Sequence, residues 1–548
     1  MKKSIIVISY CFLLLAHLRV SGQNHVYNKD SLDVIALQDV PPKSPGIATA
    51  IIDNGKVVYK QYGGYANLSD STLINEYTLF NIASNGKQFT ALAVLLLVDQ
   101  GKVSLTDDIR LYLPNVFKDI EQNITIDQLL HHTSGIRDFY DLLSLQRKTW
   151  WKLSYTNSDV LRLLEDQREL NFKPGTQYLY SNSNYVLLAL IIEQVSGLTF
   201  VNFTRQMFDQ LGMNNTFFVD DAKSLNGPIA KSYFNFGTWT TYDWIWNACG
   251  DGNIFSTLSD QIQWEMIVQG KVSQIKPELI DLSQTLPNSS ISNYGYGLEF
   301  GQYKGLTYRF HEGATGAWKA TILRFPNDNR SYITMTNTGK SIPSMQTRQM
   351  VDITYNLESD EAYFLTKPKV IGAFVDQEQI VGLYSTTDGF LFQFLEKDGI
   401  LFLRRDGRND VELKRESANI FHQKFDPDFK QEFIVNAEGI LEVTAYYINH
   451  APYTLKKIQP IKGFNFEQLN GVYKNQELGV TISLNYLGGQ EYDIRLGNDS
   501  IQKGLLLTTN EIKVGGYLLK ISGNTFRLDG DRIKNVLFDK VSNLDRDQ

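Results

Sequence analysis

Apolar and polar positions divide the chain into a first part with long apolar helices and a last part of short alternating strands. The run 88–98 is almost wholly apolar, lacks proline and stops before Gly101, which predicts a buried helix. A second run, 186–196, stops at Gly197 and predicts another buried helix. Helices this apolar on every side belong in a core, so we expect one large domain around them.

Strands are predicted on both sides of these helices along the sequence. The apolar stretch 46–52, the turn signal Asp-Asn-Gly at 53–55 and the returning stretch 56–62 predict a β-hairpin. The region 294–339 predicts further antiparallel strands, and 344–357 predicts a closing helix. Together these elements predict an α+β fold.

After about residue 371 the chain changes to short strands with frequent Gly, Asp and Asn turns. The sequence Glu-Gln-Ile-Val-Gly-Leu-Tyr at 378–384 recurs as Glu-Gln-Leu-Asn-Gly-Val-Tyr at 467–473. A repeat of this length is enough for one small barrel per copy. We therefore predict a first β-barrel over 371–461 and a second over 463–548.

The N-terminus predicts a cleaved signal peptide over 1–22. Two lysines precede an apolar run at 5–18 that is shorter than a membrane helix, and small residues follow at 20–22. We expect an exported protein, periplasmic or extracellular, although an uncleaved anchor remains an alternative. Cleavage would leave Cys249 as the sole cysteine, which excludes a disulfide framework and a cysteine metal site.

Composition narrows the choice of partners. A net charge of −7 gives no electrostatic case for nucleic acid. No segment after the signal peptide is apolar enough to span a membrane, so none is expected in the mature chain. The expected partner is a small-molecule or peptide substrate, with cell-wall fragments among the candidates.

The first candidate for chemistry is the stretch Ala-Ser-Asn-Gly-Lys at 83–87, directly before the first buried helix. Ser84 is expected at the helix N-terminus, where unpaired N–H groups favour developing negative charge. Lys87 follows one turn later, and a lysine in apolar surroundings loses proton affinity and can act as a base. The pair predicts a nucleophile with its activator, while a capping serine beside a surface lysine is the alternative.

Two further stretches carry candidate groups. Tyr180 and Asn182 are expected on a loop before the helix at 186–196; a phenol can relay protons and a carboxamide can hold a lysine and a substrate amide. His311 and Gly313 lie on a predicted strand, where glycine lets a substrate approach closely. Taken singly, these residues are better explained as a capping Asn with a half-buried Tyr and as a structural His.

Other motifs are interpreted as structural. His131 and His132 lack the spaced partners of a metal site and are expected in a loop. The pair Ser134-Gly135 is not part of a Gly-x-Ser-x-Gly elbow. The glycine-rich stretch 248–260 lacks the ending of a phosphate loop and is expected to be a turn before a capped helix.

Taken together, the motifs resemble the penicillin-recognising serine hydrolases: class C β-lactamases, D-alanyl-D-alanine carboxypeptidases, D-aminopeptidases and related esterases. The resemblance covers about residues 30–360 and rests on Ser84-x-x-Lys87, Tyr180-x-Asn182, His311-x-Gly313 and the flanking Leu-Leu-His-His-Thr-Ser-Gly, Pro-Gly-x4-Tyr-Ser-Asn and Ser-Thr-x2-Asp. It implies a β-lactamase/transpeptidase-like domain over 23–365, with an antiparallel sheet flanked by helices and an additional helical region. The two tail repeats resemble, less specifically, the lipocalin-like barrels that follow the catalytic domain in D-aminopeptidases.

The resemblance also implies roles. Ser84 would be acylated, Lys87 and Tyr180 would share the proton transfers, and Asn182 would position the substrate amide. His311, Gly313 and Ala314 would line the facing strand, with the N–H groups of Ser84 and Ala314 forming the oxyanion hole. Water would then release the acyl group. No metal ion and no organic cofactor is expected.

Two departures from the family pattern bear on the substrate. The third motif reads His-Glu-Gly, and Glu312 and Ala314 stand where carboxylate-binding relatives often carry hydroxyls. A carboxylate facing the cleft would repel an anionic substrate end. We therefore expect a D-aminopeptidase, D-amino-acid amidase or esterase-like enzyme. The alternatives are a D-Ala-D-Ala carboxypeptidase or β-lactamase and, in a different class, a penicillin- or cell-wall-binding protein without turnover.

Overall fold

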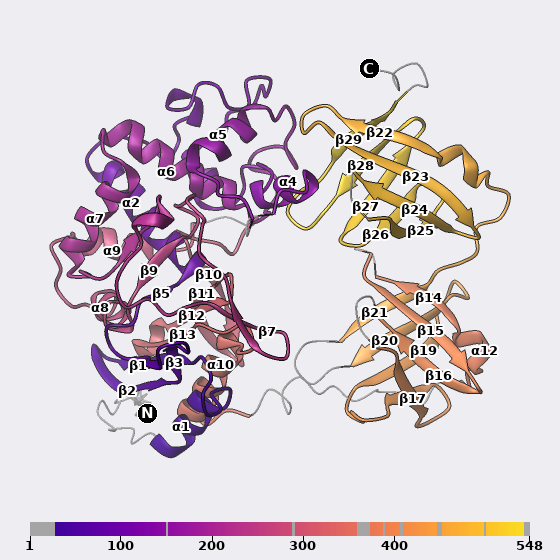
Figure 1. Cartoon of the computed structure of the whole chain (residues 1–548), viewed down its shortest axis with the longest axis horizontal. Helices are drawn as coiled ribbons and strands as arrows, with labels where there is room; N and C mark the ends of the chain where they lie inside the picture. Colours follow the sequence, from indigo (N-terminus) through magenta and orange to yellow (C-terminus); the bar gives the residue numbers. More distant parts are fainter. Residues whose placement is uncertain are drawn as a thin grey trace, which may run out of the picture.

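The computed structural model describes residues 28–149, 152–287, 291–358, 373–386, 389–405, 409–446, 452–497 and 500–541. The predicted signal peptide lies outside these residues. Figure 1 shows a large unit of helices and sheet beside two β-barrels. The predicted fold class, an α+β domain of the β-lactamase type followed by two barrels, is confirmed.

The centre of the large unit is a six-stranded antiparallel sheet with strand order β10-β11-β12-β13-β1-β2. Its strands are β1 (Ile47–Asp53), β2 (Lys56–Gly63), β10 (Glu299–Tyr303), β11 (Leu306–Thr315), β12 (Trp318–Phe325) and β13 (Arg330–Thr336). The predicted hairpin is the β1–β2 pair. Pairing of β1 with β13 joins the two distant parts of the sequence that were expected to form strands.

Helices cover both faces of this sheet, as the alternation of its side chains requires. Ala50 and Ile322 belong to the core on the side of α2 and α8. Ile51 and Leu323, one residue further along, belong to a second core with α1 and α10. The helices of the large unit are α1 (Lys29–Leu37), α2 (Lys87–Asp99), α3 (Ile126–Leu130), α4 (Phe139–Leu145), α5 (Asn157–Glu165), α6 (Asn182–Ser196), α7 (Phe200–Leu211), α8 (Leu258–Val268), α9 (Pro277–Ser283) and α10 (Pro343–Tyr355).

The two predicted apolar helices are α2 and α6, and they pack against each other in the core. Gly197 ends α6 with φ of 72°, a left-handed conformation that glycine adopts without strain. One boundary differs from the prediction. Helix α6 begins at Asn182, so Asn182 is its first residue and does not lie in the preceding loop. Polar residues can open a buried helix when tertiary partners satisfy them, which the apolar pattern alone does not register.

Each half of the tail forms a closed eight-stranded antiparallel barrel. The first comprises β14 (Gly382–Ser385), β15 (Leu391–Lys397), β16 (Ile400–Arg404), β17 (Val411–Arg415), β18 (Ile420–Gln423), β19 (Lys430–Val435), β20 (Leu441–Tyr446) and β21 (Tyr453–Lys457). The second comprises β22 (Gly471–Asn475), β23 (Val480–Gly488), β24 (Glu491–Leu496), β25 (Gln502–Thr508), β26 (Glu511–Val514), β27 (Tyr517–Ser522), β28 (Thr525–Asp529) and β29 (Val536–Lys540).

The sequence repeat is a structural repeat. In the first barrel the Tyr384 hydroxyl donates to the Ile380 carbonyl at 2.9 Å. In the second, the Tyr473 hydroxyl donates to the Leu469 carbonyl at 3.0 Å. A one-turn helix precedes the first strand of each barrel. The hydrogen bond from the tyrosine links that helix to the strand. The limits of the domains stay predictions from the sequence.

The second barrel is docked on the large unit. Arg137, 1% exposed, donates to a carboxylate oxygen of Glu477 at 2.8 Å. Side chains of the second barrel, Leu478 and Phe538 among them, belong to the same continuous core as α2 and α6, whereas the first barrel has a core of its own. Figure 1 shows the second barrel beside α4. Residues of this barrel can therefore reach sites on the large unit.

Within the described residues, no single helix has both the length and the apolarity to cross a membrane. The one pair of consecutive helices in these residues that is long and apolar enough when taken together is α6 with α7, and it is bent by 86°. Within the same residues no three His, Cys, Asp or Glu side chains gather in a way that could hold a metal ion.

Candidate active site

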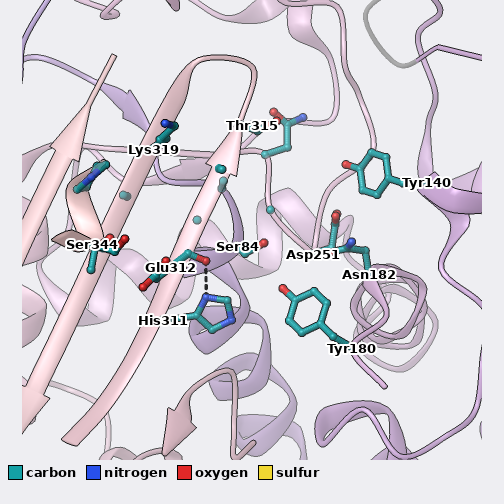
Figure 2. A pocket seen from close by; sticks show the side chains of 18 of the residues that line it. Ser84, Tyr140, Tyr180, Asn182, Asp251, His311, Glu312, Thr315, Lys319 and Ser344 are labelled. Carbon is teal, nitrogen blue, oxygen red and sulfur yellow. Dashed lines mark hydrogen bonds between the residues drawn. The ribbon is translucent and has the colours of Figure 1, made fainter. Parts of the chain in front are cut away.

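A cavity of about 690 Å³ lies between the edge of the sheet and the helical part of the large unit. All seven predicted site residues except Lys87 line it, and Lys87 lies buried directly beneath. Figure 2 shows Ser84 between Tyr180 and Asn182 on one side and the strand that carries His311 and Glu312 on the other. The fold thus brings together residues from three distant parts of the sequence.

Ser84 stands on a tight 3-10 turn, Ala83–Gly86, immediately before α2. Ala83 has φ of 49°, a left-handed conformation that is strained for a residue with a Cβ. Its N–H donates to the Asn81 side-chain oxygen at 2.9 Å, which holds the turn. Strain of this kind persists only where surrounding contacts over-determine it, and here it presents the Ser84 hydroxyl to the cavity.

Gly313 allows β11 to pass against this turn. A Cβ on Gly313 would lie 2.3 Å from the Ile82 carbonyl oxygen and 3.0 Å from the Ser84 backbone nitrogen. No side chain fits there, so the position requires glycine for close approach. The residues 311–315 of β11 continue past the stretch that pairs with β10, which ends at Phe310, and border the cavity.

Lys87 is fully buried and its ammonium group makes three hydrogen bonds. It donates to the Ser84 hydroxyl at 3.2 Å, to the Asn182 side-chain oxygen at 2.8 Å and to the Asp251 carbonyl at 2.6 Å. Burial lowers the pKa of Lys87 to about 7; the charge of Asp251 opposes this and that of Arg532 adds to it. A lysine amine with such a pKa is neutral in a substantial fraction of molecules near neutral pH.

Tyr180 lies beside both groups. The Lys87 ammonium is 4.9 Å from the centre of its ring, and Figure 2 shows its hydroxyl turned toward Ser84. Burial raises the pKa of Tyr180 well above its ordinary value, while a hydrogen bond with Ser84 and the charge of Arg532 act in the opposite direction. Tyr180 is therefore a protonated phenol in the resting site.

Asn182 is oriented by its partners on both sides. Its oxygen accepts from Lys87, and its Nδ2 donates to the Asp138 carboxylate at 2.8 Å. The same Asp138 oxygen accepts the Asn182 backbone N–H at 2.6 Å. This assignment leaves the second Nδ2 hydrogen of Asn182 for a substrate carbonyl.

His311 is a neutral residue with both ring nitrogens engaged. Its Nδ1 lies 2.8 Å from the Glu312 carbonyl, which can only accept, so Nδ1 carries the proton. Its Nε2 therefore accepts from the Tyr294 hydroxyl at 2.9 Å. Burial and the nearby Lys87 charge lower the pKa of His311 to about 3. An uncharged ring thus stands on this side of the cavity.

Glu312 lines the cavity but does not present an uncompensated charge. Its carboxylate accepts from Arg348 at 3.0 Å. Glu312 was expected to repel an anionic substrate. Because the neighbouring Arg348 cation offsets much of this repulsion, the effect is weaker than the sequence alone suggested. Ala314 also lines the cavity on the same strand.

Sequence reasoning missed four residues of the site. Asp251, in the stretch interpreted as a structural turn, lines the cavity and binds Lys87 through its carbonyl. Asp138 orients Asn182, and the only local signal was its position as the cap of α4. His132, expected in a loop, packs its ring 4.3 Å from that of Tyr180. Its Nδ1 accepts the Ser181 N–H at 3.2 Å, which fixes the strand of chain leading to Asn182.

The fourth is Arg532, on the loop between β28 and β29 of the second barrel. Its guanidinium lies 5.2 Å from the centre of the Tyr180 ring and lines the cavity. The loop is fixed by its backbone: the Arg532 N–H donates to Asp141 at 2.7 Å, and the Asp138 N–H donates to the Arg532 carbonyl at 3.3 Å. No sequence signal connects a barrel loop with a site hundreds of residues earlier.

Comparison with known proteins identifies the family. A family model described as Beta-lactamase matches residues 36–354, more than half of the chain, so the chain belongs to the β-lactamase family. The D-aminopeptidase of Brucella anthropi is 28% identical over 305 residues, 54% of this chain and 56% of that relative. The D-aminopeptidase of Gluconobacter oxydans is 26% identical over 300 residues, again 54% of this chain and 56% of the relative. The chain thus spans little more than half the length of these curated relatives.

Among solved structures, the octameric penicillin-binding protein homologue from Pyrococcus abyssi aligns with a TM-score of 0.56 and 22% identity, covering 78% of this chain and 99% of that one. At this identity the likeness establishes the fold alone. The family and the curated relatives support a β-lactamase-related hydrolase.

Proposed function

We propose that this chain is an exported serine hydrolase that cleaves amide or ester bonds through an acyl-enzyme, with D-amino-acid amides, peptides that begin with a D-amino acid and simple esters as the substrate class. One observation carries the proposal: the fully buried Lys87 donates to the Ser84 hydroxyl at 3.2 Å and has its pKa lowered to about 7. A nucleophile in hydrogen-bond contact with a base that is neutral near pH 7 is the arrangement covalent catalysis requires.

The first half of the reaction follows from this geometry. Neutral Lys87 takes the proton from Ser84 as its oxygen bonds to the substrate acyl carbon. The N–H groups of Ser84 and Ala314 stabilise the developing oxyanion, and Asn182 holds the acyl-side amide. Tyr180 gives its proton to the departing nitrogen or oxygen as the bond to the acyl carbon breaks, and Lys87 returns a proton to Tyr180.

The second half reuses the same groups. A water molecule attacks the ester carbon of acylated Ser84 and passes a proton to the base. The bond between Ser84 and the acyl carbon breaks, the base returns the proton to the serine oxygen, and the product carboxylic acid leaves. No step needs a metal ion or an organic cofactor.

The substrate class rests on the electrostatics of the cavity. The neutral His311 removes a cation that would pair with a substrate carboxylate. The two relatives named D-aminopeptidase favour the same class. Arg532, in contrast, places a cation in the cavity, which is the specific observation in favour of the second candidate, a D-Ala-D-Ala carboxypeptidase or β-lactamase.

The test has a labelling arm and a turnover arm. Purified protein is treated with a fluorophosphonate, and the labelled peptide is identified by mass spectrometry; label on Ser84 is expected, and label elsewhere contradicts the nucleophile. Turnover is then compared on D-alanine amide, a D-Ala-D-Ala peptide, a nitrophenyl ester and a chromogenic cephalosporin. Ser84→Ala should lose all activity, whereas Ser522→Ala, an exposed serine at the end of β27, should keep it.

The outcomes distinguish the candidates. Highest specificity constants on the amide or ester support the proposal. A faster reaction with the D-Ala-D-Ala peptide or the cephalosporin would replace it with the second candidate. Stable acylation of Ser84 without turnover of any substrate would instead favour the binding protein. Export is tested separately, by N-terminal sequencing of protein recovered outside the cytoplasm, with a start near residue 23 expected.

A further inference from the structure

A second cavity, of about 640 Å³, opens beside the active-site cavity. We call it the aromatic side cavity, because most of its wall is ring surface. The rings come from the hairpin of β7 (Tyr233–Asn235) and β8 (Trp239–Thr241), from the segment after it and from β12: Phe234, Phe236, Tyr242, Trp244, Trp246 and Trp318. None of the residues assigned above to the reaction lines it.

The aromatic side cavity adjoins the active-site cavity. Trp244 and Trp246 line both cavities. Tyr140, on the active-site side, stacks on Trp246 with ring centres 5.3 Å apart, and Trp244 meets Trp318 edge-to-face at 5.3 Å. Rings that border both cavities therefore lead from the active site toward the side cavity.

The inner part of this wall is preformed. The Trp244 indole N–H donates to the Asn253 side chain at 2.9 Å, and the Trp318 indole N–H donates to the Ala230 carbonyl at 2.7 Å. With these indole N–H groups bonded within the protein, Trp244 and Trp318 offer apolar ring surface. The Trp246 Nε1 has no hydrogen-bond partner among the described residues, and Lys152 and Asp243 also line the cavity. A largely apolar wall with a few polar groups is typical of small-molecule sites.

The outer part is exposed to water. Phe236 is 72% exposed and Tyr242 is 61% exposed, and Phe234 lies between them with ring centres 5.9 Å and 5.8 Å away. Single exposed apolar residues are common, but three adjoining rings at the mouth of a cavity form a patch that gains free energy when covered. A ligand with apolar surface would cover it.

The position of the cavity selects one part of the substrate. The leaving group must lie within reach of the Tyr180 hydroxyl, which gives it a proton. The side cavity begins at the other end of the β11 segment, past Thr315 and toward Gly316 and Trp318. Figure 2 shows Thr315 and Tyr180 on opposite sides of Ser84. The acyl part of the substrate, which stays on Ser84, therefore extends toward the rings.

We propose that the aromatic side cavity binds an apolar side chain on the acyl part of the substrate, either an aromatic ring or an alkyl chain of several carbons. This inference rests on the proposed function and narrows its substrate class to apolar acyl groups. Burying each methylene group of such a chain is worth roughly a fourfold gain in binding.

The test compares nitrophenyl acetate with nitrophenyl octanoate, which share a leaving group. We expect kcat/KM to be at least about a hundredfold higher for the octanoyl ester than for the acetyl ester. Burial of only part of the octanoyl chain is enough for this gain. The combined variant Phe236→Ala with Tyr242→Ala should reduce the octanoyl-to-acetyl ratio at least about tenfold, because both rings are lost from the mouth. Phe425→Ala, an 84% exposed phenylalanine in the first barrel, should leave both rate constants unchanged.

Several results would overturn the proposal. Equal kcat/KM on both esters in wild type, or an unaltered ratio in the double variant, would show that the rings do not select the acyl group. If kcat/KM rises with the apolar size of the leaving group and not with that of the acyl group, the cavity binds the leaving group instead.

A binding measurement separates this proposal from the proposed function. Octanamide is titrated into Ser84→Ala, with tryptophan fluorescence as the readout because three tryptophans line the cavity. Saturable binding that acetamide does not show, and that the ring substitutions weaken, supports the side cavity even if neither ester is turned over. Failure of octanamide to bind overturns the side cavity and leaves the hydrolase proposal standing if the acetyl ester is cleaved.

Discussion

Replacing Arg532 with methionine should move the acid limb of the pH profile to higher pH. The guanidinium lies 5.2 Å from the centre of the Tyr180 ring, and its charge lowers the pKa of both Lys87 and Tyr180. The Lys87 ammonium lies 4.9 Å from the same ring centre, so 4.9 Å plus 5.2 Å places the two cations at most about 10 Å apart. Two unit charges about 10 Å apart interact by about 1.7 kcal/mol with an effective dielectric constant of about 20. Solvent at the cavity reduces this to about 1 kcal/mol, which corresponds to a little under one pKa unit.

The sign follows from which form of Lys87 is active. Only the neutral amine accepts the Ser84 proton, so activity rises with pH through the pKa of Lys87, about 7. Loss of a neighbouring positive charge makes the protonated amine more stable and raises that pKa. Arg532→Met should therefore lose most activity below neutral pH and recover toward wild type about two units above the limb.

The assay is kcat/KM for a neutral nitrophenyl ester across the acid limb. Arg532→Lys keeps the positive charge and should keep the limb near its wild-type position. Arg404→Met, which removes an exposed arginine of the first barrel, controls for loss of charge far from the site. If the Arg532→Met profile overlies that of wild type, the electrostatic reasoning is wrong; a uniform loss at every pH would instead indicate a steric role.

Three further changes have defined outcomes. Ser84→Ala should reduce turnover by at least roughly a thousandfold with an unchanged circular dichroism spectrum, and retention of a tenth of wild-type activity would refute the nucleophile. Gly313→Ala should abolish activity and lower the Tm, since its Cβ would lie 2.3 Å from a backbone carbonyl oxygen; a normal Tm would show that β11 yields. Glu477→Ala should cost about 2–4 kcal/mol in unfolding free energy, because Arg137 loses its closest carboxylate partner while buried. Glu491→Ala, which breaks an exposed pair, should cost under about 1 kcal/mol, and equal losses in both variants would contradict the argument.

The elements that were predicted correctly depend on residues that lie close together in the sequence. The apolar runs of α2 and α6 and the turn between β1 and β2 depend on neighbours a few residues away, and these elements are confirmed. Ser84 and Lys87 were predicted as a pair for the same reason, since one helical turn joins them. The repeat that predicted two barrels is likewise a comparison of short stretches.

What the sequence did not predict depends on contacts between distant segments. The neutral state of His311 follows from its burial and from the nearby Lys87 charge, and both arise only after the sheet and α2 have packed together. Arg348 reaches Glu312 from α10, so the charge assigned to that strand is paired. Arg532 enters the cavity because the second barrel docks on the large unit. Neither the composition of the chain nor the spacing of its motifs predicts that the second barrel docks on the large unit.

Because Arg532 lies near the end of the chain, it joins the active site only after most of the protein has been synthesised. Domains generally fold as units as they leave the ribosome, N-terminal part first. Ser84, Lys87 and Tyr180 can take their places in the large unit before the barrel that carries Arg532 has been synthesised. Until then Lys87 lacks the Arg532 charge, which adds to the effect of burial in lowering the pKa of Lys87. The site therefore reaches its final proton affinity late, when the second barrel closes and its loop settles against Asp138 and Asp141.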